Sequence, residues 1–288
     1  MYGLLTKAAS PDILNSAWKR SSRDKALWRP GLPRREMERD MAYHLVAMAE
    51  QLRDGSYTPD PVRYFSVSKG DGKQRIISAS TLRDKVAQRA VLSVIEPIGE
   101  ALFHQDSFGY RPGRTIEMAL SRVREYMLCG LNWIVNADIK ECFDNIPHKQ
   151  LLKAVRRIIK DDKAVTLIEK WLNAGTVKRG FISGPRGLPQ GAVLSPFLCN
   201  LYLTGLDNVL SSKNFAFVRF ADDFIIFCET EKKANISYEC AEKTLKGLGM
   251  SLNSKKTRIT VAGPNIRFLG RKLPKLKRVI KCSKENRL

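Results

Sequence analysis

The stretch "FVRFADDFIIFC" at residues 217–228 places two adjacent aspartates between two runs of bulky apolar residues. Such runs are typical of buried strands on either side of a tight turn, so the stretch predicts a β-hairpin with Asp222 and Asp223 at its tip. Aspartate is common in turns, and one interpretation is a simple polar turn. The other is a metal site, which needs a third carboxylate from elsewhere in the chain.

Asp138 is the candidate for that third carboxylate. The segment "WIVNADIKECF" (133–143) predicts a mostly buried strand that runs out at Asp138. An ionised group there is costly to bury unless it is paired or binds a metal, so a helix cap or an arginine partner remains an alternative. Because successive strand side chains face opposite ways, we expect one of Asp222 and Asp223 to ligate more directly than the other.

Three carboxylates within several Å repel each other by about 4 kcal/mol per close pair at an effective dielectric near 20, so the cluster requires cations. Hard oxygen ligands at this density suit Mg²⁺. Two such ions about 3.5–4 Å apart activate an attacking hydroxyl and stabilise a leaving oxygen in phosphoryl transfer.

The net charge indicates a polyanionic partner. The 288 residues are enough for one large domain or two modest ones. Fifty Lys and Arg against 29 Asp and Glu give a net charge of +21. The basic residues gather at 18–35 and 271–288, and although such runs are commonly solvated surface, two of them on this chain favour nucleic acid.

Several classes of protein are disfavoured. The chain has no run of about 18 uncharged apolar residues, so we expect no membrane span, and its N-terminus does not resemble a signal peptide. The six cysteines form no C-x-x-C pair and the three histidines do not cluster, which argues against a zinc site or a disulfide framework. We therefore expect a cytoplasmic protein.

Strand and helix signals alternate without βαβ regularity, which predicts an α+β architecture. The expected helices cover 36–55, 81–103 with a break or kink at Pro97, a segment capped by Asn145, 165–172, a segment from Ser195, and 232–248. The expected strands lie in a hairpin at 63–80, at 133–143, in the aspartate hairpin, and at 268–273.

Seven sequence blocks occur in an order that resembles bacterial reverse transcriptases, most closely the group II intron lineage. Five of them are "ADIKECFDNI", "LPQGAVLSPFLCNLYL", "FVRFADDF", "GLGMSLNSKKTRI" and "IRFLG". Upstream of these stand "GSYTPDPVRYFSVSKGDGKQRIISASTLRDKVAQRAVLSVIEPI" and "DSFGYRPGRTIEMAL". The resemblance covers roughly residues 50–270, and it favours the metal site over the polar turn.

The resemblance implies a right-hand polymerase with fingers and an antiparallel palm sheet backed by helices, its thumb truncated or missing. A protein or RNA partner would then replace the thumb. The implied parts are a basic N-terminal extension (1–45), fingers (46–130), a palm (131–270) with a fingers-like helical segment at about 147–175, and a basic tail or thumb remnant (271–288).

The same resemblance implies roles for the acids. Asp138, Asp222 and Asp223 are the expected catalytic and metal-binding carboxylates, and the backbone carbonyl of Ile139 is a further metal ligand. Asp138 and Asp222 are expected to bind most directly, with Asp223 in support. Two Mg²⁺ ions are implied, and Mn²⁺ is expected to substitute for them.

Further positions match nucleotide-binding residues of the family. Lys69 and Arg75 would grip the incoming triphosphate, with an exposed turn as the alternative. Phe143 would be the gate that clashes with a ribonucleotide 2′-hydroxyl, with core packing as the alternative. Gln190 and Gly191 would lie along the nucleotide and template, where glycine lets the backbone approach closely.

Three basic residues complete the implied set. Lys256 either lies near the triphosphate or is a surface lysine, and Arg111 and Arg114 would contact the template backbone. One departure is Phe220, which stands where the family usually has tyrosine. Another is the lack of the family's usual proline after Arg75.

The implied activity is RNA-directed DNA polymerisation, in which the 3′-hydroxyl of a DNA or RNA primer attacks a dNTP opposite an RNA template. The alternatives are a catalytically idle polymerase fold that serves as an RNA-binding scaffold, and a template-independent nucleotidyltransferase. A retroelement, a CRISPR-associated system and another phage-defence system are all compatible settings.

Overall fold

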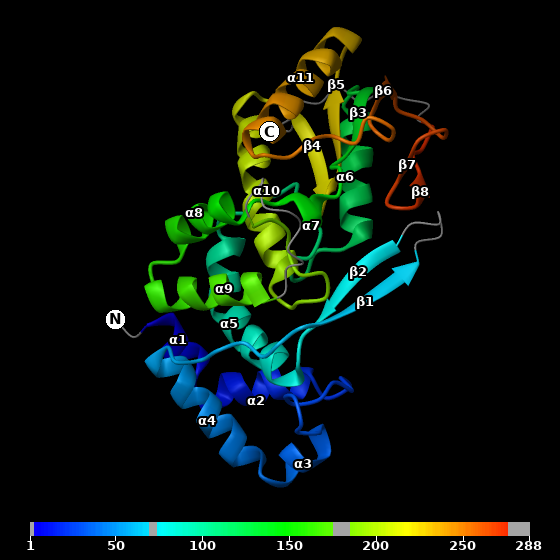
Figure 1. The fold of residues 1–288 in the computed structure, drawn as a ribbon. Coiled ribbons are helices and arrows are strands. Elements are labelled where there is room, and N and C mark those ends of the chain that lie inside the picture. Colours follow the sequence, from blue (N-terminus) through cyan, green and yellow to red (C-terminus); the bar gives the residue numbers. More distant parts are fainter. Residues whose placement is uncertain (1–2, 69–73, 175–184, 276–288) are drawn as a thin grey trace. The chain divides into compact units, whose positions relative to one another are not determined.

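The structure is a computed structural model that describes residues 3–68, 74–174 and 185–275. Figure 1 shows its helices and strands, coloured along the sequence. The chain divides into two compact units. The first comprises Met1–Ala101 and Ile146–Leu198, and the second comprises Leu102–Asn145 and Cys199–Leu288. These units group residues by packing, whereas the expected fingers and palm ranges are functional divisions that stay predictions.

The described part of the first unit is mostly helical and also contains a β-hairpin. The two strands of this hairpin pair antiparallel from Arg63 opposite Ala79 to Ser68 opposite Gln74, and all of β1 is exposed. Its elements are α1 (Leu4–Ala8), α2 (Pro11–Arg20), α3 (Arg34–Arg39), α4 (Met41–Asp54), β1 (Arg63–Ser68), β2 (Gln74–Ala79), α5 (Leu82–Glu100), α8 (His148–Ile158) and α9 (Asp162–Ala174).

The second unit is built on a four-stranded antiparallel sheet in the order β4-β5-β3-β6. The sheet strands are β3 (Trp133–Asp138), β4 (Ala216–Phe220), β5 (Asp223–Cys228) and β6 (Arg258–Val261). Its other elements are α6 (Ile116–Leu128), α7 (Cys142–Asn145), α10 (Ser195–Ser212, which belongs to this unit from Cys199 on), α11 (Glu231–Gly247), β7 (Arg267–Phe268) and β8 (Arg271–Lys272).

Helices cover this sheet. The helix α6 packs on β4 and contributes Val123 and Met127 to a buried cluster with Ile134, Val218 and Ile225. These three sheet residues lie on one face, because strand side chains alternate and the register aligns Val218 with Ile225. The helix α11 packs against β3, β5 and β6. The expected α+β architecture with an antiparallel sheet is confirmed.

The aspartate hairpin is confirmed, but several expected helix boundaries are wrong. The helix expected over 36–55 is interrupted at Asp40, which has non-helical dihedrals between α3 and α4. No break occurs at Pro97, because α5 continues through it to Glu100, and the kink that was the other expectation stays a prediction. Asn145 ends α7 and donates its amide to the Lys140 carbonyl, so Pro147 directly precedes α8 instead.

The cysteines follow the expectation in part. Cys142, Cys199 and Cys228 are free and buried, and Cys240 is free and half-buried. The expectation of free cysteines is wrong for Cys129, whose sulfur takes part in a disulfide. None of the helices in the described ranges combines the length and the apolar character needed to cross a lipid bilayer.

Candidate active site

Two of the expected carboxylates are neighbours across the sheet of the second unit. Asp138 is the last residue of β3, Asp223 is the first residue of β5, and the register pairs them directly. Directly opposed residues of antiparallel strands share a face, with Cβ atoms about 4.5–5.5 Å apart. Two ionised carboxylates in this arrangement repel each other unless their charge is neutralised.

The Asp138 carboxylate is contacted by two side chains from the segment before β6. Asn253 Nδ2 donates to Asp138 Oδ2 at 2.8 Å, and Lys256 Nζ donates to Asp138 Oδ1 at 3.2 Å. The backbone N–H of Asn253 also donates to the Asp138 carbonyl at 2.8 Å. The lysine side chain is 66% exposed, so its charge is largely solvated. The segment therefore fixes Asp138 while neutralising the site only in part.

The electrostatics of Asp223 show how much negative charge has gathered. Burial, followed by the nearby Asp222 and Asp138 carboxylates, raises the pKa of Asp223 to about 6, while Lys256 lowers it. A carboxyl group whose ionised form is disfavoured by two other carboxylates lies in a site that is short of positive charge. A divalent cation would supply what is missing.

Asp222 lies in the tight turn between the strands. Because Phe220 pairs with Asp223, the hairpin loop consists of Ala221 and Asp222 alone. Ala221 has φ of 58°, in the left-handed region where glycine is favoured. Asp222 therefore lies directly beside Asp223, and its charge raises the pKa of Asp223. The strand register, however, places Asp223 and not Asp222 directly opposite Asp138.

A cavity of about 160 Å³ opens at the Asp138–Asp223 pair. The short β7–β8 hairpin borders it with Arg267 and Leu269, which sequence reasoning did not single out. Asn253 was also missed, although "GLGMSLNSKKTRI" and "IRFLG" were recognised as blocks, because nothing in their composition shows that they meet the end of β3. The lining residues are Asn136, Ala137, Asp138, Asp223, Lys256, Arg267, Phe268 and Leu269.

The donor set fits magnesium better than a softer metal. Carboxylate oxygens and a backbone carbonyl are hard ligands, and magnesium takes few protein ligands besides phosphate oxygens and water. Within the described ranges, no three His, Cys, Asp or Glu side chains already stand in a metal-holding arrangement. Ile139 is buried and pairs with Leu252 through an isolated bridge.

Phe143 lies in α7, which follows β3. Its ring is half-buried and meets the ring of Tyr110 edge to face, with centroids 6.1 Å apart and an interplanar angle of 84°. Tyr110 is itself 52% exposed, and its φ of 58° lies in the left-handed region. Phe143 is therefore braced on one side by an aromatic residue and is not fully enclosed in the core.

The two arginines expected to contact the template are engaged within the protein. Arg111 is buried, and its guanidinium donates to the carbonyls of His104 at 2.7 Å and Ser107 at 2.6 Å. Arg114 is half-buried and donates to the Gln105 carbonyl at 3.0 Å. These contacts shape the loop before α6, and a template contact of either arginine stays a prediction.

The expected nucleotide-binding residues of the first unit are only partly described. Lys69 lies outside the described residues, and the backbone of Arg75 pairs with Val67 in the β1–β2 ladder. The Gln190 carbonyl accepts from both the N–H of Ser78 at 2.9 Å and its hydroxyl at 3.1 Å.

Gly191 follows with φ of 109°, and a Cβ there would stand 2.7 Å from the Ser78 carbonyl oxygen. Glycine is therefore required at this position because the chain passes close to the backbone of β2.

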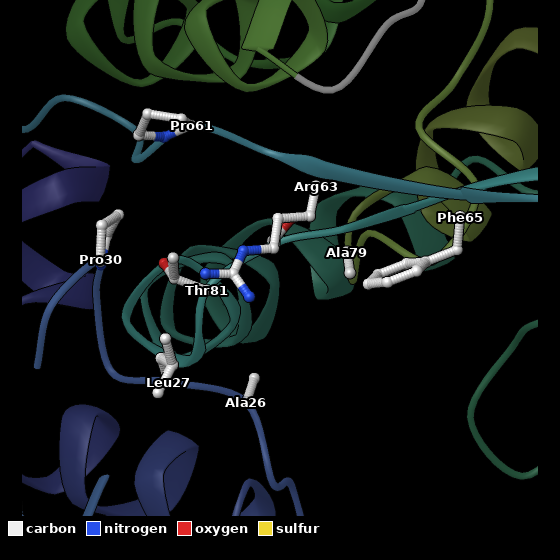
Figure 2. A pocket seen from close by; sticks show the side chains of 9 residues that line it. Ala26, Leu27, Pro30, Pro61, Arg63, Phe65, Ala79 and Thr81 are labelled. Atoms are coloured by element: carbon white, nitrogen blue, oxygen red, sulfur yellow. The ribbon is translucent and has the colours of Figure 1, made fainter. Parts of the chain in front are cut away.

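A second cavity, also of about 160 Å³, lies in the first unit beside the β1–β2 hairpin (Figure 2). Arg63 and Phe65 from β1 and Ala79 from β2 border it, together with the loop around Pro30. No sequence pattern pointed to this hollow, because its wall combines segments far apart in the chain. Its residues are Ala26, Leu27, Pro30, Pro61, Arg63, Phe65, Ala79, Ser80 and Thr81.

Comparison with known structures supports the fold. The telomerase of Candida albicans bound to a fragment of telomeric RNA aligns with a TM-score of 0.55 at 14% identity, over 84% of this chain and 49% of that one. The apo telomerase of Candida tropicalis gives a TM-score of 0.54 at 15% identity, over 70% and 50%. At these identities the likeness shows a shared fold alone.

Comparison of sequences supplies the family. Protein YkfC of Escherichia coli is 30% identical over 94% of this chain and 82% of its own length. The group II intron-encoded protein LtrA of Lactococcus lactis is 39% identical over 59% of this chain, which spans only 28% of LtrA. Residues 67–273 match the family described as reverse transcriptase (RNA-dependent DNA polymerase). The chain therefore belongs to the reverse transcriptase family, and the resemblance to its group II intron lineage is confirmed.

Proposed function

We propose that Asp138, Asp222 and Asp223 bind two Mg²⁺ ions and that the protein uses this site to extend a primer with dNTPs along an RNA template. The observation that carries the proposal is the direct opposition of Asp138 and Asp223, with Asp222 in the adjoining turn. Family membership supplies the RNA-directed DNA polymerase activity. The raised pKa of Asp223 supports cation binding, since a nearby positive charge would relieve it.

The reaction is a phosphoryl transfer. The primer 3′-oxygen forms a bond to the α-phosphorus of the dNTP, the bond from that phosphorus to the bridging oxygen breaks, and pyrophosphate leaves. The proton of the primer hydroxyl passes to solvent. Bound divalent ions supply activation of the hydroxyl and neutralisation of the leaving group. Asp138 and Asp222 would hold them directly, together with the Ile139 carbonyl, and Asp223 would support them.

The other expected residues act on the nucleotide and the template. Lys69, Arg75 and Lys256 would neutralise the triphosphate, as guanidinium and ammonium groups do for phosphate oxygens. Phe143, braced by Tyr110, would exclude a 2′-hydroxyl.

Gln190 and Gly191 would line the nucleotide and template path, with the Gln190 carbonyl held by Ser78 and Gly191 close to the Ser78 backbone. Arg111 and Arg114 would lie near the template backbone.

The partners follow from the charge and the reaction. A net charge of +21 suits an RNA template paired with a DNA or RNA primer, because each neutralised phosphate releases counterions. Mn²⁺ would substitute for Mg²⁺, since both accept oxygen ligands. A cytoplasmic setting stays a prediction.

Primer extension on an RNA template tests the proposal. We expect Asp138→Asn and Asp222→Asn each to lower the rate by about 10³-fold, equivalent to about 4 kcal/mol of transition-state stabilisation. Glu239→Gln, an exposed acid of α11 in the same unit, is the matched control and should leave the rate unchanged. If the wild type extends no primer with Mg²⁺ or Mn²⁺, the proposal fails and the RNA-binding scaffold is favoured. Primer extension whose product does not depend on the template sequence would indicate a template-independent nucleotidyltransferase.

A further inference from the structure

Arg219 is a fully buried charge that the proposed reaction does not use. It lies in β4, one residue before Phe220, and both its side chain and that of Asp207 are 0% exposed. Burying an ion pair removes both charges from water at a large desolvation cost, so such a pair is weak evidence of stabilisation by itself. Its contacts indicate what else it does.

The Arg219 guanidinium binds three groups at once. Nε donates to Asp207 Oδ1 at 2.8 Å and Nη2 donates to Asp207 Oδ2 at 2.5 Å, which is a bidentate pair. Nη1 donates to Asn200 Oδ1 at 2.9 Å and to the Ala221 carbonyl at 3.0 Å. Ala221 immediately precedes Asp222, so this buried arginine is hydrogen-bonded to the backbone of the aspartate turn itself.

Sheet geometry explains how Arg219 reaches the turn without entering the site. Side chains alternate along β4, so Arg219 lies on the face opposite to Phe220 and its cross-strand neighbour Asp223. Asn200 and Asp207 are seven positions apart on α10, which is about two helical turns and therefore one helix face. The arginine thus links α10 to the turn from behind the carboxylates.

The turn is fixed from a second direction by Gly109. Asn200 Nδ2 donates to the Gly109 carbonyl at 2.7 Å, and a Cβ on Gly109 would stand 2.4 Å from the Ala221 nitrogen. Ala221 meanwhile holds φ of 58°, a conformation that alanine rarely adopts alone. Such a backbone persists only where its surroundings over-determine it, and such sites cluster where function needs fixed geometry.

We propose that Arg219, Asp207 and Asn200 form a positioning unit that fixes the Ala221 carbonyl and thereby the directions in which Asp222 and Asp223 present their carboxylates to divalent ions. The inference rests on the proposed function and adds the residues that set the geometry of its metal ligands. None of the three is exposed enough to touch a substrate, so they act through the turn.

The double variant Arg219→Met/Asp207→Leu separates positioning from stability. Replacing a buried ion pair by apolar residues of similar volume is commonly neutral for folding, whereas removing one partner is not. The double variant should therefore stay folded but lose the donor to the Ala221 carbonyl. Asn200→Ala is a second variant, which keeps the ion pair but removes the link to Gly109.

The measurement is Mn²⁺ binding to the full chain by electron paramagnetic resonance, alongside primer extension. We expect both variants to bind Mn²⁺ about 10–100-fold more weakly, as is usual when groups that orient metal ligands are lost. The kcat should fall by a similar factor while the KM for dNTP changes by less than about threefold. Arg122→Met is the matched control, because Arg122 pairs with Asp106 at 2.7 Å in the same unit and donates no hydrogen bond to the turn.

The outcomes distinguish this inference from the function on which it rests. No Mn²⁺ binding by the wild type would refute the proposed metal site itself. The positioning role would be overturned if the folded double variant, or folded Asn200→Ala, bound Mn²⁺ as tightly as the wild type does. An equal loss of Mn²⁺ affinity in Arg122→Met would also overturn it, because the effect would then be one of general destabilisation.

Discussion

Asp138 and Asp223 face each other directly across β3 and β5, on one face of the sheet and far apart in the chain. Cross-strand pairs of like charge destabilise a sheet. The fold therefore carries an electrostatic cost at this pair, and the size of that cost is measurable.

Asp223→Asn should stabilise the metal-free protein at neutral pH. The pKa of Asp223 is raised from 3.8 to about 6, so the folded state holds this proton more tightly than the unfolded state does. The free energy of unfolding therefore falls as pH rises from about 4 to about 6 and stays lowered above that range. After a discount for partial solvent exposure, we expect a gain of about 1–2 kcal/mol at pH 7.5.

Thermal unfolding of both proteins at pH 3.5 and pH 7.5, without divalent ions, measures this difference. The gain should vanish at the lower pH, where the wild-type carboxyl is protonated in both states. Adding Mg²⁺ at pH 7.5 should stabilise the wild type more than the variant, because a ligand stabilises the state that binds it. A gain of equal size at both pH values would refute the electrostatic explanation.

Lys256→Met tests whether this lysine contributes to nucleotide binding or only to the stability of the fold. Its ion pair with Asp138 is largely exposed, and such pairs contribute about 0–1 kcal/mol, so the thermal midpoint should barely move. If Lys256 also neutralises the triphosphate, the KM for dNTP should rise about 5–10-fold through loss of one charged contact of about 1–1.4 kcal/mol. Steady-state primer extension measures this. An unchanged KM would leave Lys256 as a surface lysine.

Phe143→Ala should admit ribonucleotides. The ring is half-buried and braced by Tyr110, so its removal opens space where a 2′-hydroxyl would otherwise clash. We expect the preference for dNTP over rNTP, as a ratio of kcat/KM values, to fall by about 10–100-fold, or about 1.4–2.7 kcal/mol. Competition between the two nucleotides in primer extension gives that ratio. Phe143→Tyr, which keeps the ring, is the control, and unchanged discrimination in Phe143→Ala would remove the gate.

The sequence predicted what depends on local pattern. The apolar runs around Asp222 predicted the hairpin, and the apolar run before Asp138 predicted β3, because burial and alternation are visible in a single segment. The net charge predicted the class of partner. Asn145 was misplaced as a cap, since the short helix α7 that it ends has too few residues to show a periodicity.

The parts that were missed depend on contacts between distant segments. Asn253 meets Asp138, and Arg267 borders the same cavity, only because β6 pairs with β3 and the β7–β8 hairpin follows it. The buried role of Arg219 was hidden because an arginine in an apolar strand gives no sign of its partner. Asp207 lies on α10 and becomes that partner only after folding.

Gly109→Ala should displace the backbone of the aspartate turn, although Gly109 is not part of that turn. The new Cβ would stand 2.4 Å from the Ala221 nitrogen, so the backbone must shift, at a cost of about 1–3 kcal/mol. A displacement of about 1 Å at the carboxylates costs about 10²-fold in rate, which we expect in primer extension. Gly247→Ala is the matched control, because its Cβ would meet no neighbour within 4 Å at the end of α11. That control should gain about 0.5–1 kcal/mol from helix propensity and keep full activity. Equal activity of the two variants would show that the turn tolerates movement and that its close packing has no bearing on catalysis.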